Sequence, residues 1–133
     1  MSKLILIPTP IGNLDDITLR AIECIKDVDL ILCEDTRRSL KLMNHLEIKK
    51  PLKSFHKFNE HSTVEKILFA IQSGIKVGLI SDAGTPSISD PGYLIVKMCI
   101  DNNIDVECLP GPTALIPALA ISGLPSELSL IHI

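Results

Sequence analysis

Short runs of apolar residues recur along the chain, and each is followed by a polar turn and then by apolar residues at helical spacing. A run that is apolar at nearly every position is typical of a strand covered on both faces. Such strands, when they alternate with helices, are typical of a parallel sheet. The five runs interpreted as strands are residues 3–7, 28–33, 51–55, 76–80 and 104–109. The sequence therefore predicts an α/β fold with a five-stranded, mostly parallel sheet flanked by helices.

Capping residues predict where the helices between these strands begin and end. Gly74 is expected to close the third helix, and Gly123 to end the fifth. In the fifth helix we expect Pro112 and Thr113 to form the first turn. The residues expected to begin the first four helices are Asp15 or Asp16, Thr36, Ser62 in a capping box with Glu65, and Asp90 followed by Pro91.

Length and charge limit the class of protein. A chain of 133 residues is long enough for one domain with a real core, and 46% hydrophobic residues with 22% charged residues are typical of a globular fold. The net charge of −3 argues against a free-standing nucleic-acid-binding protein, which usually has a basic surplus. Any contact with RNA must therefore use a local basic patch or come from elsewhere.

The four cysteines are Cys24, Cys33, Cys99 and Cys108, and all lie in apolar runs without a C-x-x-C pair. This pattern predicts reduced core cysteines and no metal site. The apolar run at the N-terminus is too short for a signal peptide, and no run approaches the ~20 apolar residues of a membrane span. We expect a cytoplasmic protein that does not contact a membrane.

Polar residues, glycines and prolines gather just after each predicted strand. Open α/β sheets bind ligands beyond the carboxyl ends of their strands, so these loops predict a ligand cleft at that edge. The loops on the opposite edge are plainer. The segments at the predicted ligand edge are residues 9–13, 34–37, 56–60, 81–92 and 110–113.

The first strand is followed by neither a G-x-G-x-x-G dinucleotide fingerprint nor a P-loop, which argues against a standard NAD enzyme or NTPase. Gly12, Gly84 and Gly111 lack side chains where backbone could approach a ligand closely. Carboxylates lie near these glycines but few lysines do. The loops therefore suit a ligand with positive or neutral parts better than a polyphosphate.

Each loop taken alone also has a purely structural interpretation. Residues 81–92 could be a turn followed by a helix start, and Glu34-Asp35-Thr36-Arg37 could be a capped helix with a surface ion pair. The segment 110–113 could be a turn and a helix cap. A single loop histidine such as His56 is weak evidence for catalysis.

The motifs taken together, in this order, resemble the tetrapyrrole-methylase superfamily, and within it the bacterial 16S rRNA (cytidine-2′-O)-methyltransferases. The resemblance covers roughly residues 3–127. The motifs that carry it are Thr9-Pro10-Ile11-Gly12-Asn13-Leu14, Glu34-Asp35-Thr36-Arg37, His56 with Asn59-Glu60, Ser81-Asp82-Ala83-Gly84-Thr85-Pro86 through Ser89-Asp90-Pro91-Gly92, Leu109-Pro110-Gly111-Pro112, and Ser122-Gly123-Leu124-Pro125.

The resemblance implies transfer of a methyl group from S-adenosylmethionine (SAM) to the 2′-hydroxyl of a cytidine in 16S rRNA of the small ribosomal subunit. It also implies a homodimer of two-domain subunits with SAM between the domains, residues 1–127 forming the N-terminal α/β domain. The second domain, which would supply the other wall of the cleft, is not in this sequence. Residues 128–133 depart from the family pattern and equal the translation of a sequencing adapter, CTGTCTCTTATACACATC, so we expect a non-native tail.

The resemblance also assigns roles to residues of the polar loops. A ribose hydroxyl is a poor nucleophile, so a general base is expected, and the candidates are His56, Glu34 and Asp35. Arg37 and Arg38 are candidates for holding RNA phosphate. The start of the fifth helix at Pro112 and Thr113 is expected to bind the SAM carboxylate or an adenine nitrogen. The full set of expected SAM-binding residues is Pro10, Gly12, Ser81, Asp82, Ala83, Gly84, Thr85, Pro110, Gly111, Pro112 and Thr113.

Two alternatives remain open on the sequence alone. One is a superfamily enzyme that methylates a tetrapyrrole carbon or a modified protein side chain. The other is a truncated, inactive fragment that binds at most a small ligand weakly.

Overall fold

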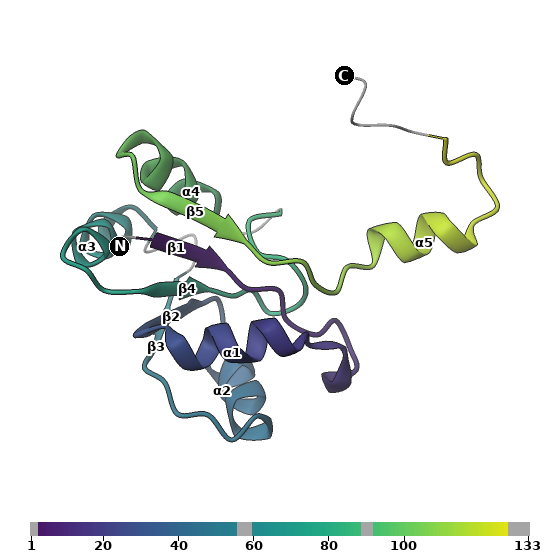
Figure 1. Cartoon of the computed structure of the whole chain (residues 1–133), viewed down its shortest axis with the longest axis horizontal. Coiled ribbons are helices and arrows are strands. Elements are labelled where there is room, and N and C mark those ends of the chain that lie inside the picture. The colour runs from purple at the N-terminus through teal and green to yellow at the C-terminus, as the bar shows by residue number, and fades with distance from the viewer. Residues whose placement is uncertain (1–2, 56–59, 89–91, 128–133) are drawn as a thin grey trace.

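The sheet has the predicted composition of five strands, and all of them run parallel (Figure 1). The computed structural model describes residues 3–55, 60–88 and 92–127. The order of strands across the sheet is β3-β2-β4-β1-β5. The strands are β1 (Lys3–Leu6), β2 (Leu30–Cys33), β3 (Leu52–Ser54), β4 (Val77–Leu79) and β5 (Asp105–Cys108). The predicted fold class is confirmed, and each strand lies inside its predicted run.

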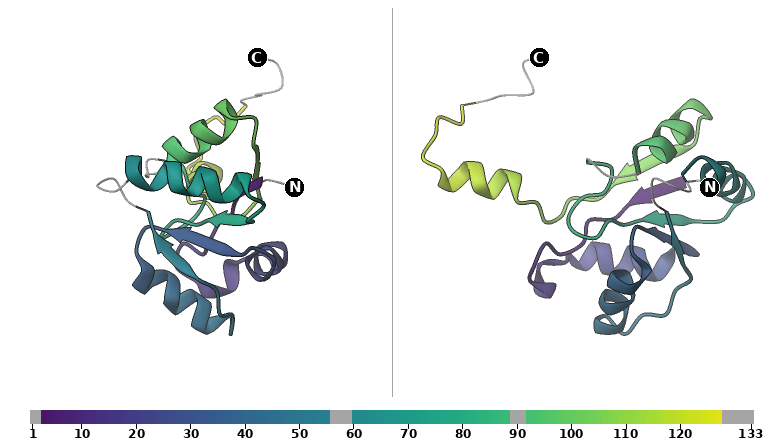
Figure 2. Two further views of the ribbon diagram at one scale, coloured as in Figure 1. Left: turned by 90° about the vertical axis from the view of Figure 1, so that its left-hand side faces the viewer. Right: turned by 180° about the vertical axis from the view of Figure 1, so that it is seen from behind.

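Helices cover both faces of the sheet (Figures 1 and 2). Leu4 and Leu6 of β1 point into the core beneath α3 and α4, whereas Ile5 and Ile7 point into the core beneath α1 and α2. Successive side chains of a strand point to opposite faces of the sheet. Because helices cover both faces, nearly every position of the strand must be apolar, which explains the unbroken apolar runs. The helices are α1 (Leu19–Asp27), α2 (Thr36–His45), α3 (Glu60–Gln72), α4 (Gly92–Asp101) and α5 (Leu115–Ile121).

The first helix begins later than predicted. Leu14–Asp16 forms a separate 3-10 turn, η1, in which the Asn13 side chain accepts a hydrogen bond from the Asp15 N–H at 2.9 Å. Thr18 caps α1, because its Oγ1 accepts from the Ala21 N–H at 3.0 Å. The assignment of the cap to Asp15 or Asp16 is therefore wrong.

The starts of α2 and α3 also differ from the prediction. Asp35 caps α2, and Thr36 is the first helical residue. Ser62 lies inside α3 rather than at its start, so the predicted capping box with Glu65 is wrong. Gly74, with a φ of +102°, follows the end of α3 as predicted. Residues 89–91, with the predicted Asp90 cap, and the tail 128–133 lie outside the described residues.

The fifth helix extends away from the sheet (Figures 1 and 2), and none of its residues is buried. It begins at Leu115 with Ala114 as its N-cap, so the prediction of Pro112 and Thr113 as its first turn is wrong. No helix in the part of the chain that the structure describes is long and apolar enough to cross a membrane.

The cysteines divide between the core and the surface. Cys33 and Cys99 are buried, and burial raises the pKa of the Cys99 thiol to about 11. Cys24 is half-buried, and Cys108 is exposed on the edge strand β5, so the prediction of a core position is wrong for Cys108. All four are free thiols.

Candidate functional site

The chain reverses its direction across the sheet between β1 and β4. The connection that leaves β1 runs to α1 on one face, whereas the connection that leaves β4 runs to α4 on the other face. The two strands are neighbours, so their following loops diverge and leave a crevice between them. This is the topological switch point at which open α/β sheets bind ligands.

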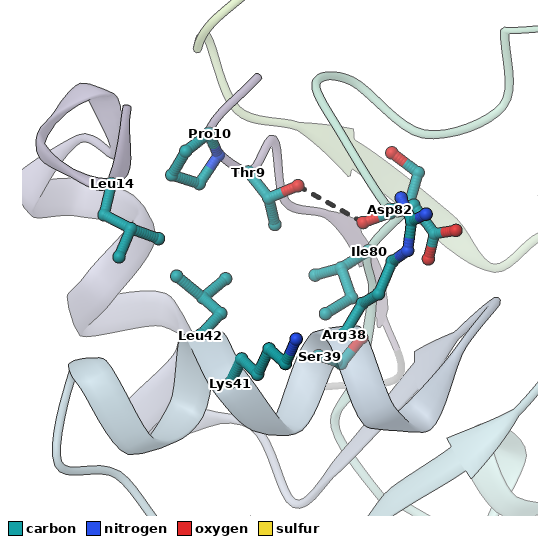
Figure 3. Close-up of a pocket in the computed structure, with 10 residues that line it drawn as sticks. Thr9, Pro10, Leu14, Arg38, Ser39, Lys41, Leu42, Ile80 and Asp82 are labelled. Carbon is teal, nitrogen blue, oxygen red and sulfur yellow. Dashed lines mark hydrogen bonds between the residues drawn. The ribbon is translucent and has the colours of Figure 1, made fainter. Parts of the chain in front are cut away.

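The two loops are joined at this point by a short bridge. The Thr9 N–H donates to the Gly84 carbonyl at 3.1 Å, and the Gly84 N–H donates to the Thr9 carbonyl at 3.0 Å. The Thr9 hydroxyl also donates to the Ser81 carbonyl at 3.2 Å (Figure 3). Thr9 is only 3% exposed, so these bonds are shielded from water and fix the two loops relative to one another.

The side chain of Ser81 stabilises the turn that follows β4. The Ser81 hydroxyl lies 3.0 Å from the Ala83 carbonyl and 3.2 Å from the Gly84 carbonyl, to which it donates. Gly84 has a φ of +75°, which favours glycine, and an added Cβ would lie 3.4 Å from the Pro112 carbonyl oxygen. The loops that follow β1, β4 and β5 therefore meet at Gly84, as the sequence predicted for one edge of a parallel sheet.

A cavity of about 210 Å³ opens between this pair of loops and α2 (Figure 3). Asp82 supplies a carboxylate to it, and the Asp82 Oδ1 accepts from the Asp35 N–H at 3.3 Å. Of the predicted SAM-binding residues, Pro10, Ser81 and Asp82 line this cavity. Its lining consists of Thr9, Pro10, Leu14, Arg38, Ser39, Lys41, Leu42, Ile80, Ser81 and Asp82.

The helix α2 contributes Arg38, which the sequence analysis proposed as an RNA-binding residue, and also Lys41 and Leu42, which it missed. Arg38, Lys41 and Leu42 are spaced i, i+3 and i+4, and this spacing places them on one helical face toward the cavity. That spacing was readable in the sequence, but nothing there indicated which face of α2 meets the loops. Lys41 is the one lysine in the lining of this cavity, and it lies there with Arg38 and the carboxylate of Asp82.

A second, open cavity of about 630 Å³ lies beside the first, where the loops after β1 and β5 meet. Three residues that the sequence analysis expected to bind SAM, Gly111, Pro112 and Thr113, line this cavity together with Asp16. The remaining residues of its lining are Ile11, Thr18, Ile116 and Pro117. The other predicted SAM-binding residues, Gly12, Ala83, Gly84, Thr85 and Pro110, line neither of these two cavities.

The three candidate bases differ in their surroundings. Asp35 Oδ1 accepts from the Arg37 N–H at 2.9 Å and from the Arg37 Nε at 3.4 Å. The backbone hydrogen bond from Arg37, and then its guanidinium, hold the pKa of the Asp35 carboxyl below its ordinary range, which makes this carboxylate a weak base. Glu34 is half-buried beside it, and its carbonyl accepts from the Ser54 hydroxyl at 3.1 Å. His56 lies outside the described residues.

Within the described ranges, no three His, Cys, Asp or Glu side chains gather where they could hold a metal ion. The arrangement can instead offer backbone carbonyls, two separate carboxylates and apolar walls to an organic ligand. Such a mixture is typical of small-molecule sites.

Comparison with known proteins places this site in a family. The family model for tetrapyrrole (corrin/porphyrin) methylases matches residues 3–132. The chain is 52% identical over 127 residues to "Ribosomal RNA small subunit methyltransferase I" of Thermotoga maritima, with 96% of this chain and 57% of that protein covered. For the protein of the same name from Escherichia coli O157:H7, the identity is 49% over 125 residues, with 94% of this chain and 44% of that protein covered. The chain thus spans about half the length of these curated relatives.

Solved structures agree on the fold. Diphthine synthase superposes with a TM-score of 0.71 at 13% identity, covering 93% of this chain and 50% of that one. The cobalt precorrin-4 methyltransferase CbiF superposes with a TM-score of 0.70 at 21% identity, covering 90% and 49%. Because the family model matches nearly the whole chain and the fold agrees, this chain belongs to the tetrapyrrole methylase family.

Proposed function

We propose that this chain forms one wall of the SAM-binding cleft of an rRNA methyltransferase, whose acceptor is the ribose 2′-hydroxyl of a cytidine in 16S rRNA. The observation that carries the proposal is the identity of about half of all residues, over nearly the whole chain, to proteins named as small-subunit rRNA methyltransferases. In this proposal the protein works in the cytoplasm on the small ribosomal subunit.

The residues at the switch point fit SAM by their chemistry. SAM, when bound, supplies a methyl group carried by a positively charged sulfur. A positive sulfur favours carbonyl and carboxylate oxygens, and the crevice contains the carbonyl-rich turn after β4 and the carboxylate of Asp82. The apolar side chains of Pro10, Leu14 and Ile80 can cover the uncharged parts of the ligand. The larger cavity at residues 111–113 falls within the range of about 300–1,000 Å³ of ordinary ligand sites.

The protein's task in methyl transfer is mainly to hold the reacting groups in line. The bonds that join Thr9, Ser81 and Gly84 fix the two loops before any ligand binds, so we propose that they position the SAM-binding wall. The proposed base is His56 or Glu34, since the hydrogen bonds from Arg37 lower the pKa of Asp35 and make its carboxylate a weak proton acceptor. His56 follows Phe55, whose N–H donates to the Cys33 carbonyl at 2.7 Å at the carboxyl edge of the sheet.

The second half of the cleft belongs to the proposal as well. We propose that the complete protein has a further domain that closes the crevice, and that it works as a homodimer. The exposed apolar side chains of α5 support this, because no part of the chain that the structure describes buries them. The same surface favours the second candidate, that the 133 residues alone bind SAM weakly and do not catalyse transfer.

Calorimetry with SAM tests the assignment of the site. Asp82→Ala should lower the affinity at least about tenfold, as expected for loss of a charged partner. Asp105→Ala, which removes an exposed carboxylate from the amino end of β5, is the matched control and should leave the affinity unchanged. Equal affinities for the wild type and Asp82→Ala would contradict the site.

Transfer of a labelled methyl group by the complete protein tests the substrate. We expect incorporation into small ribosomal subunits and none into a porphyrinoid. His56→Ala should leave SAM binding intact and reduce turnover. Normal turnover in that variant would leave Glu34 as the proposed base.

A further inference from the structure

We propose that Arg38 and Lys41 of α2 together hold one backbone phosphate of the RNA substrate at the mouth of the 210 Å³ cavity. This inference rests on the proposed RNA substrate, and it assigns to Lys41 a role in positioning that substrate. Both residues line the cavity and both side chains are exposed.

Arg38 and Lys41 lie on one face of α2, and both line the cavity. Residues three apart on a helix have Cβ atoms about 5–6 Å apart, so two long side chains can converge on one anion. Figure 3 shows Arg38 extending from α2 toward the turn at Asp82. Ser39 between them is only 4% exposed, so the helix presents its neighbouring positions to the cavity from a fixed backbone.

The charge of α2 is unlike that of the whole chain. Its ten residues include Arg37, Arg38 and Lys41 and no acidic residue, although the chain carries a net charge of −3. The sequence analysis expected any contact with RNA to use a local basic patch or to come from elsewhere, and α2 provides such a patch beside the cleft.

Arg38 and Lys41 are also available to bind an anion. Among the residues that the structure describes, the cations with a carboxylate partner are Lys3, Arg20, Lys26, Arg37, Lys76 and Lys97. Within the described ranges, neither Arg38 nor Lys41 forms such a pair. Arg37 differs, because its Nε lies 3.4 Å from Asp35 Oδ1, and it is absent from the cavity lining.

A phosphodiester suits this pair better than the SAM carboxylate does. An arginine fork can donate two parallel hydrogen bonds to phosphate oxygens, and a lysine adds a point charge. Arg38 and Lys41 are exposed, whereas Asp82 is half-buried, and its carboxylate repels an anion and attracts a cation. The carboxylate of Asp82 thus favours the positive sulfur of SAM, whereas Arg38 and Lys41 favour the negative RNA backbone.

Binding of RNA by the 133-residue chain tests the proposal. The probe is a fluorescent single-stranded oligoribonucleotide containing cytidine, titrated at salt concentrations between about 50 and 200 mM. R38Q and K41Q should each lower the affinity about threefold to tenfold and reduce the salt slope by up to about 0.7. Because both hold the same phosphate, the loss in the double variant should be smaller than the product of the two single losses.

K49Q is the matched control, since Lys49 is an exposed lysine beyond the end of α2 and is absent from the cavity lining. It should change the affinity less than twofold. Equal losses in K49Q and K41Q would overturn the proposal in favour of diffuse attraction, and so would fully multiplicative losses in the double variant. Absence of RNA binding by the wild-type chain at the lowest salt would also overturn it.

SAM calorimetry on the same variants shows whether Arg38 and Lys41 bind the RNA phosphate or the SAM carboxylate. R38Q and K41Q should bind SAM like the wild type. Weaker SAM binding with unchanged RNA binding would assign the pair to the cofactor carboxylate and overturn the proposal. Failure of the complete protein to methylate small subunits would contradict the proposed function instead, while the pattern of RNA binding among the variants would be unaffected.

Discussion

At the scale of single residues, Gly111 leaves no room for a side chain next to Pro8. A Cβ added to Gly111 would lie 2.3 Å from the Pro8 Cβ, which is far below contact distance. The sequence analysis interpreted this glycine as leaving space for a ligand. The structure shows that the space is taken by the chain itself, because the ends of β1 and β5 pack directly against one another.

Gly111→Ala should therefore destabilise the fold. The clash cannot be relieved without moving a proline ring or the backbone, so we expect the free energy of unfolding to fall by about 1–3 kcal/mol. Gly12→Ala is the matched control, because nothing lies within 4 Å of its added Cβ, and it should change stability by less than about 0.5 kcal/mol. Urea unfolding of both variants measures the difference, and equal stabilities would contradict this account of the packing.

The lowered pKa of the Asp35 carboxyl group predicts that the stability of the fold depends on pH. Its folded pKa lies below the ordinary value of about 3.9 because it accepts hydrogen bonds from Arg37. A lowered folded pKa means that the stabilisation is complete above the ordinary value and is lost as the pH falls through the folded pKa. Asp35→Ala should thus be less stable than the wild type at pH 7, and thermal unfolding should show this difference shrinking below about pH 4. A gap independent of pH would mean that the carboxylate is not what caps α2.

At the scale of elements, the N-cap of α1 is Thr18 in the structure, whereas the sequence predicted Asp15 or Asp16. The Thr18 hydroxyl accepts from the Ala21 N–H, whereas Asp15 takes part in the preceding turn through its backbone. Thr18→Ala should lower the free energy of unfolding by about 1 kcal/mol, the usual cost of a lost cap. Asp15→Ala should cost less than half of that. Chemical denaturation decides, and a larger effect at Asp15 would restore the cap predicted from the sequence.

The strands were predictable because burial on both faces of the sheet requires an apolar residue at nearly every strand position. Each of the five apolar runs contains a strand, although the strands are shorter, since residues such as Val28 and Ile104 are buried in connections outside the ladder. The caps were less predictable. Asn13, Asp15, Asp16 and Thr18 can all cap a helix, and only the 3-10 turn decides among them.

At the scale of the whole molecule, the sequence predicted which edge of the sheet carries the site, but it did not predict which loops contact one another there. Parallel strands place all their following loops on one edge, so the motifs alone were sufficient for that prediction. The order β3-β2-β4-β1-β5 decides which loops touch, and it sets Thr9 against Gly84. Lys41 was missed for the same reason, because its role depends on how α2 faces the crevice.

The exposed helix α5 yields the last prediction. Leu115 and Ile121 are 75% and 88% exposed, and none of the helix is buried, so α5 contributes little to the core of this chain. A variant that ends at Thr113 should keep the free energy of unfolding within about 0.5 kcal/mol of the 133-residue chain. It should also bind less of a hydrophobic dye and associate less at high concentration, because a large apolar patch is removed.

Leu115→Lys combined with Ile121→Lys is the matched control for the truncation. It keeps the helix and removes two of its exposed apolar side chains, so it should lower dye binding and association while stability stays unchanged. Urea unfolding and light scattering measure the two properties separately. A loss of several kcal/mol in the truncated chain would show that α5 packs on the sheet, and the surface proposed to meet a further domain would then already be covered within this chain.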